Sequence, residues 1–209
     1  MRTFLSWADQ HRHLPRGLHL PPDRRAVPRQ PADPEHRWVI ARRLIHDDDL
    51  DPADRVAGAL VVLYAQPLAR IVALTTGHVH IEHVRVENDV VTLALGPAHI
   101  ELPEPFAGLI QTLPRHRHGG PPAHLPTEWL FPSVRAGKHT TPQALANRLR
   151  VLGIAAGRQR QAALLQLAGE VPPSMLADLL GIHVTTAVHW NRTSAGNWAT
   201  YAAARGPHR

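Results

Sequence analysis

The basic residues that lead into one apolar segment are the strongest chemical signal in this sequence. Arg158 and Arg160 precede residues 162–168, where alanine and leucine recur at the spacing of a buried helical face. A packed helix can hold a guanidinium group still, and a cation held still can stabilise negative charge on a phosphate group. The sequence leaves two roles open for Arg160, a phosphate-binding group or a buried ion-pair partner of Glu170 or Asp178.

The residues around this segment predict short helices and turns that would position the basic side chains. Pro172 and Pro173 are tolerated in the first turn of a helix but not in its interior. Gly181 suits the left-handed position directly after a helix end, so a short helix is expected to stop there. Upstream, Thr141-Pro142 predicts the start of a helix over 143–152. The densest basic cluster of the chain comprises Lys138, Arg148, Arg150, Arg158 and Arg160.

The positive charge of the chain is concentrated in its second half. The net charge is +6, but residues 1–104 contain 12 basic and 14 acidic side chains, whereas residues 105–209 contain 11 basic and 3 acidic ones. Such an imbalance is typical of a protein that binds a polyanion, and nucleic acid is the usual one. The alternative is that the charge serves only solubility.

The composition also limits which cellular compartment and which kinds of ligand are expected. The chain has no cysteine, which excludes disulfides and thiolate metal sites and suits a reducing cytoplasm. No apolar run approaches the roughly 18 residues of a membrane span, and the N-terminus lacks the apolar core of a signal peptide. His-x-His pairs occur without a neighbouring metal-binding pattern and are interpreted as surface residues. We therefore expect a cytoplasmic protein with no membrane segment, metal or cofactor.

The hydrophobic pattern upstream predicts helices followed by a small sheet. Residues 1–34 are rich in proline, arginine and histidine and are expected to be extended or disordered. Residues 35–205 are expected to form one domain, mainly α with a small three-stranded antiparallel β-meander, and residues 206–209 a tail. Helices are expected at 35–46, 54–64, 68–75, 106–113 and 194–204, and strands at 79–86, with a bulge at His83, 90–95 and 99–102.

Five segments resemble the catalytic domain of the tyrosine recombinases, the phage integrase and Xer-type family. Arg160-Gln161-Ala162 is followed by Glu170-Val171-Pro172 and by Leu179-Leu180-Gly181-Ile182-His183. Upstream, residues 63–79 resemble the helix that carries the family's first arginine, and Trp129-Leu130-Phe131-Pro132 resembles its Leu-Phe-Pro segment. The resemblance implies a mainly helical domain with a small meander that binds double-stranded DNA.

The same resemblance implies catalytic roles, which this sequence matches only in part. Family members attack a phosphodiester with a tyrosine while two arginines stabilise the developing charge. Arg160 matches the second arginine, Arg70 lies one helical turn beyond the place of the first, and His183 lies beside the family's histidine position. Tyr201 is well past the expected nucleophile position, at Asn191. The resemblance thus predicts DNA binding without cleavage, with an active recombinase that uses Tyr201 as the alternative.

Residues 174–192 also resemble a helix-turn-helix, which would make the protein a transcription regulator. Gly181 would form the tight turn between the two helices. Val184, Ala187 and Val188 would pack on the first helix. The side chains expected to face the major groove of DNA are His183, Thr185, Thr186, His189 and Arg192.

These interpretations give one set of candidate DNA-binding residues. Double-stranded DNA is the expected partner, and a second copy of the chain or another protein is left open. A third class, a protein-interaction remnant of an enzyme fold, differs from the other two because it predicts no salt-dependent DNA affinity. The candidate DNA-binding residues are Lys138, Arg148, Arg150, Arg158, Arg160, Thr185, Thr186, His189 and Arg192.

Overall fold

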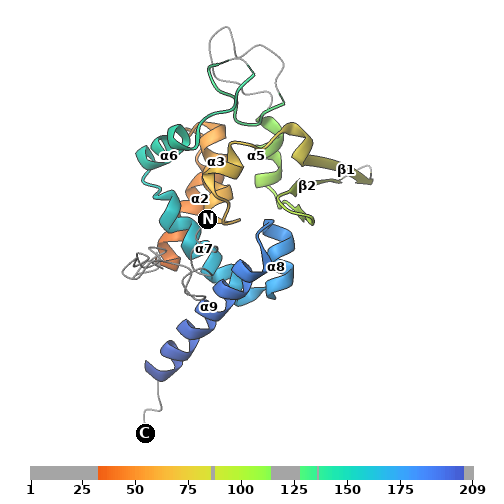
Figure 1. Cartoon of the computed structure of the whole chain (residues 1–209). Helices are drawn as coiled ribbons and strands as arrows, with labels where there is room; N and C mark the ends of the chain where they lie inside the picture. Colours follow the sequence, from red (N-terminus) through yellow and green to blue (C-terminus); the bar gives the residue numbers. More distant parts are fainter. Residues whose placement is uncertain (1–32, 86–87, 114–127, 136, 205–209) are drawn as a thin grey trace, which may run out of the picture. The chain divides into compact units, whose positions relative to one another are not determined.

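A computed structural model describes residues 33–85, 88–113, 128–135 and 137–204. These residues form a mainly helical body with a small antiparallel sheet (Figure 1). Nearly all of the N-terminal segment predicted at 1–34 lies outside the described residues, as do the loop at 115–126 and the tail at 206–209.

The first two helices begin where the sequence places a capping aspartate before a proline. Helix α2 spans Pro34–His46, and the Asp33 carboxylate accepts a hydrogen bond from the backbone N–H of Glu35 at 3.0 Å. Helix α3 spans Pro52–Val62, and Asp51 caps it in the same way. The two predicted helices are therefore confirmed, with shifts of one or two residues at their ends.

The predicted helix at 68–75 is much shorter than expected. Helix α4 spans only Leu68–Ile71, and the backbone then tightens into turns in which Ala73 N–H donates to the Arg70 carbonyl. Thr75 is already extended, with φ −113° and ψ 167°. It pairs with Trp129 in a β-bridge, in which Leu130 N–H donates to the Leu74 carbonyl and Thr76 N–H donates to the Glu128 carbonyl, so the pairing of these two distant segments ends the helix.

The predicted meander is present beside these helices. After a short 3-10 helix at Thr76–His78, β1 spans Val79–Arg85, β2 Asn88–Ala94 and β3 His99–Glu101, in the antiparallel order β1-β2-β3. The register shifts between His83 and Arg85, which places an irregularity where the sequence predicts a bulge. Buried side chains of β2 then join the sheet to the main core.

The main core is built around α3, whose eight residues from Arg55 to Val62 are all buried. The guanidinium of Arg55 donates to the carbonyls of Leu44 and Ile45 and so ties α3 to the last turn of α2. Two further helices pack on α3, namely α5 at Phe106–Thr112 and α6 at Pro142–Val151. This core joins the helices of the first half of the domain to β2 of the sheet.

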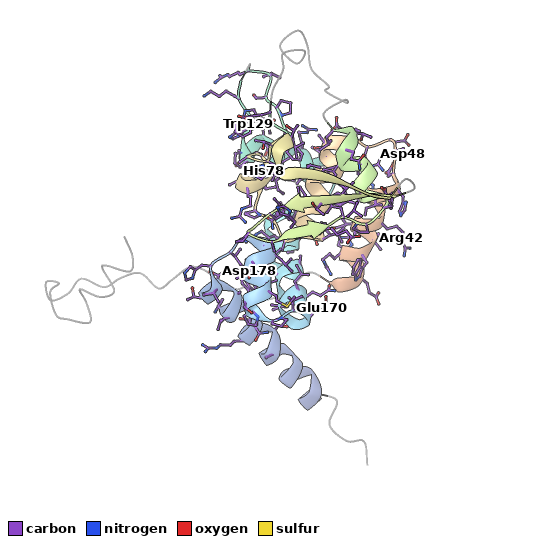
Figure 2. The ribbon with its side chains drawn as sticks, turned by 90° about the vertical axis from the view of Figure 1, so that its right-hand side faces the viewer. Arg42, Asp48, His78, Trp129, Glu170 and Asp178 are labelled. Atoms are coloured by element: carbon purple, nitrogen blue, oxygen red, sulfur yellow. The ribbon has the colours of Figure 1, made fainter. Side chains whose placement is uncertain are left out.

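Three helices at the C-terminal side form a second, smaller core. Helix α7 spans Ala156–Glu170, α8 Pro173–Leu180 and α9 Val184–Ala204, and the last turns of α9 extend beyond α7 and α8 (Figures 1 and 2). Residues 194–204 are helical as predicted, but they form the last turns of the continuous α9 and not a helix of their own. Ser194 is 5 % exposed inside the helix, so it packs inward instead of capping a new one.

The sheet meets α8 through a direct contact between two backbones. A Cβ atom added at Gly96 would lie 2.1 Å from the Asp178 carbonyl oxygen and 2.6 Å from the Gly181 nitrogen. Gly181 itself has a left-handed φ of 59°, as predicted for the end of α8. Figure 2 shows Asp178 on the side of α8 that is nearest the sheet. The turn after β2 therefore requires glycine because the neighbouring atoms are backbone atoms that cannot rotate away.

We predict that Gly96→Ala lowers the free energy of unfolding by about 2–3 kcal/mol, because the new methyl group would overlap the backbone of α8. Gly157→Ala is the matched control, since a Cβ at Gly157 meets nothing within 4 Å. Urea denaturation followed by tryptophan fluorescence measures both variants. Equal stability of the two variants would contradict the close backbone contact.

Candidate nucleic-acid interface

Helices α8 and α9 are joined by a turn of three residues, in the manner of a helix-turn-helix. The backbone N–H of Ile182 donates to the Ala177 carbonyl, which closes the end of α8. His183 then begins α9, because its carbonyl accepts from the N–H of Thr186 at 2.9 Å and its ring Nδ1 accepts from the N–H of Thr185 at 3.3 Å. The turn geometry thus follows directly from Gly181 and His183.

The inner face of α9 packs on α7 and α8 through small side chains. Ala187 is fully buried, and Asn191, four residues later, donates from its side chain to the Ala168 carbonyl of α7 at 2.8 Å. Trp190 is partly buried against the same cluster. Alanines let the helix backbones approach closely, so α9 is held by contacts along two neighbouring helices. The buried cluster comprises Ala65, Ala163, Leu164, Ala168, Leu176, Ala177, Leu180 and Ala187.

The opposite face of α9 is exposed and carries most of the predicted groove-facing side chains. Thr185, His189 and Arg192 follow one another at four and three residues, so they lie along one stripe of the helix. Thr186 is also exposed, as is His183 at the start of the helix. The structure therefore brings these predicted residues to one outward surface.

Two valines of this helix are more exposed than the sequence predicts. Val184 is 47 % exposed and Val188 is partly exposed, whereas both were expected to pack on the first helix with Ala187. The helical period explains the difference, because Ala187, Asn191 and Ser194 occupy the inner face and leave the valines at its border. A surface hollow of about 340 Å³ lies between Val184, Thr185, Val188, His189 and Arg192.

Arg70 connects this three-helix unit to the rest of the body. One terminal nitrogen of its guanidinium donates to the Leu95 carbonyl at 3.0 Å and to the Leu180 carbonyl, and the other donates to the Gly181 carbonyl at 2.8 Å. Leu180 and Gly181 form the C-terminal end of α8, where carbonyl oxygens lack helical partners and concentrate negative charge. Arg70 is thus engaged in holding the end of α8 against the end of β2.

Arg160, on α7, binds a different carbonyl. Its Nε donates to the Ala65 carbonyl at 2.8 Å. Burial lowers the pKa of Arg160, and the positive charge of Arg70 lowers that pKa further. In the described part of the chain Arg160 forms no ion pair with Glu170 or Asp178, and its terminal nitrogens have no hydrogen-bond partner.

The remaining predicted basic residues differ in whether their charge is paired with a carboxylate. Arg148 forms ion pairs with Asp51 at 3.0 Å and with Asp54 at 2.8 Å, which join α6 to the start of α3. Arg150 is exposed and donates to the Asn147 side chain. Lys138 and Arg158 are exposed. The predicted basic cluster therefore contains fewer unpaired charges than the sequence indicates, because one of its members is paired with carboxylates almost a hundred positions away.

In the described part of the chain, no hydrogen bond joins a tyrosine hydroxyl to Arg70 or Arg160. Tyr64 stacks on Phe106 with ring centroids 5.7 Å apart, and burial raises the pKa of its hydroxyl to about 12. Tyr201 belongs to α9, but its side chain lies outside the described residues. The described residues also contain no group of histidines and carboxylates that could hold a metal ion, and no helix long and apolar enough to cross a membrane.

Sequence reasoning did not identify the residues that position this surface. Asn191 was considered only as the place of a missing nucleophile, yet it anchors α9 to α7. Gly96 was interpreted as part of a turn, which it is, but its contact with α8 joins residues about 80 positions apart. A Gly-Pro pair predicts a turn in any protein, so the sequence held no signal for the second role.

We predict that Arg70→Lys lowers the free energy of unfolding by about 1.5–3 kcal/mol, because an ammonium group cannot reach three carbonyls in two directions. Arg42→Lys, a change at an exposed position of α2, should leave stability unchanged. Thermal and urea denaturation provide the measurement. If Arg70→Lys unfolds at the same urea concentration as Arg42→Lys, the three carbonyl contacts do not support the fold.

No protein-family model, no curated protein and no solved structure matches this chain.

Proposed function

We propose that this protein binds double-stranded DNA through the helix-turn-helix formed by α8, Gly181 and α9, with the exposed stripe of α9 in the major groove. The observation that carries the proposal is the division of α9 into two faces. Its inner face is fixed by the buried cluster around Ala187, and its outer face presents Thr185, His189 and Arg192 to solvent. A rigid helix with polar side chains on its free face suits groove recognition.

The chemistry of the exposed stripe fits the edges of bases. An arginine can donate two hydrogen bonds to guanine, and histidine can donate to or accept from several bases. Exposed cations elsewhere, namely Lys138, Arg150 and Arg158, are available for phosphate groups. The excess of 11 basic over 3 acidic residues in 105–209 favours the approach of a polyanion.

We further propose that the domain is a recombinase-like scaffold used for binding DNA in the cytoplasm without cutting it. The support is that Arg70, the candidate for the first catalytic arginine, donates to three backbone carbonyls. A guanidinium committed in this way would have to break those bonds before it could stabilise a transition state. Burial raises the pKa of the Tyr64 hydroxyl to about 12 and its ring stacks on Phe106, which makes Tyr64 a poor nucleophile.

We predict that Arg192→Ala weakens binding to a duplex selected from a random library by about tenfold, because it removes a contact to a base edge. Arg42→Ala removes the same charge from α2 and is the matched control. Fluorescence anisotropy at several salt concentrations gives the affinities, which should fall steeply as salt rises. An equal effect of the two substitutions, or binding that does not respond to salt, would contradict the proposed surface.

Strand cleavage is the second candidate function, and one observation favours it. The terminal nitrogens of Arg160 have no hydrogen-bond partner in the described part of the chain, and the positive charge of Arg70 lowers the pKa of Arg160. Nicked suicide substrates, which trap a covalent protein–DNA adduct, test it directly. We expect no adduct with the wild-type protein. An adduct that is lost in Tyr201→Phe would replace the binding proposal with an active recombinase.

A further inference from the structure

The hollow on the outer face of α9 has a more specific chemistry than a generally basic surface. Its walls include the methyl groups of Val184 and Val188, and Val184 is 47 % exposed at the start of the helix. Aliphatic side chains exposed on a DNA-facing helix cannot form hydrogen bonds with bases. A ligand therefore fills this hollow without a loss of binding free energy only if it presents an apolar group there.

Thr185 adds a third methyl group to the same walls. Its hydroxyl lies 2.8 Å from Nδ1 of His183, so the polar side of this residue is already engaged within the protein. The γ-methyl group is then the part of Thr185 left for a ligand in the hollow. Three methyl-bearing side chains thus adjoin one another within a single turn of α9.

Arg192 and His189 line the same hollow and give it a charged and polar border. Arg192 lies four residues after Val188, on the same side of the helix. An arginine at this distance would meet the base next to the one that occupies the apolar part. Guanine is the base whose O6 and N7 match a guanidinium fork.

We propose that this hollow receives the 5-methyl group of a thymine and that Arg192 contacts the guanine beside it, so that the protein reads a thymine–guanine step in duplex DNA. The inference rests on the proposed function, because it requires α9 to lie in the major groove. Thymine is the one standard base that presents a methyl group there. The positive border complements the negative charge of the same duplex.

Two repeating duplexes test the methyl contact without changing the protein. One strand alternates thymine and guanine, and in the second duplex deoxyuridine replaces every thymine, which removes the methyl groups and preserves the backbone charge. We expect the thymine duplex to bind at least fourfold more tightly, about the value of one buried methyl group. Binding to both duplexes with equal affinity would overturn the inference and leave the proposed function intact. Binding to neither would overturn both.

The double variant Val184→Ala, Val188→Ala tests the location of the contact. Alanine favours helix, so α9 should remain folded. The double variant should bind the thymine duplex and the deoxyuridine duplex with about equal affinity. Its affinity for the deoxyuridine duplex should be that of the wild-type protein. Val39→Ala, at a 64 % exposed valine of α2, is the control that should retain the full preference. A preference that survives in the double variant would show that the methyl group is read elsewhere.

Arg192→Ala tests the guanine contact separately. We expect it to weaken binding to the thymine–guanine duplex by about tenfold and to have little effect on an alternating thymine–adenine duplex. An equal loss on both duplexes would assign Arg192 to the phosphates instead of to guanine and would overturn this part of the inference.

Discussion

The contact between Arg70 and the end of α8 joins the sheet to the C-terminal helices, which also pack on the main core where α7 meets α3. Three backbone carbonyls from two distant segments accept hydrogen bonds from this one guanidinium, and Gly96 and Gly181 let the two backbones approach. The orientation of α8 is therefore fixed relative to the sheet. Because only three residues separate the end of α8 from the start of α9, the same contact also influences the direction of α9 and of its exposed face.

Arginine serves the same structural purpose elsewhere in this fold. Arg37 donates to the Val62 carbonyl at the end of α3, and Arg55 donates to carbonyls at the end of α2. Arg160 binds the Ala65 carbonyl just beyond α3. Arg37 and Arg55 meet oxygens at helix ends that lack helical partners, where the helix dipole favours a cation. Several arginines of this chain therefore bind backbone carbonyls, and only the arginines without such contacts are candidates for binding DNA.

The two faces of α9 show how rigidity and recognition are separated on one helix. Ala187 and Asn191 fix the helix against its neighbours, so substitutions on the other face can change recognition without unfolding the domain. The hollow between Val184 and Arg192 lies on that free face. Its apolar and charged parts are adjacent because the helical repeat places residues three and four apart next to each other.

The sequence by itself determined the local features of this protein. Capping aspartates before Pro34 and Pro52, the left-handed glycine that ends α8, and the order of helices and meander follow from short-range sterics and hydrogen bonding, which a few neighbouring residues specify. The exposure of Thr185 and Arg192 follows from the helical period. Tertiary structure alone decided that Arg70 is bound to carbonyls and that Arg148 is paired with Asp51. It also decided that residues 72–75 leave the helix, where Thr75 pairs with Trp129. These contacts join residues far apart in the chain, and no local pattern encodes which distant partner a side chain or strand will meet.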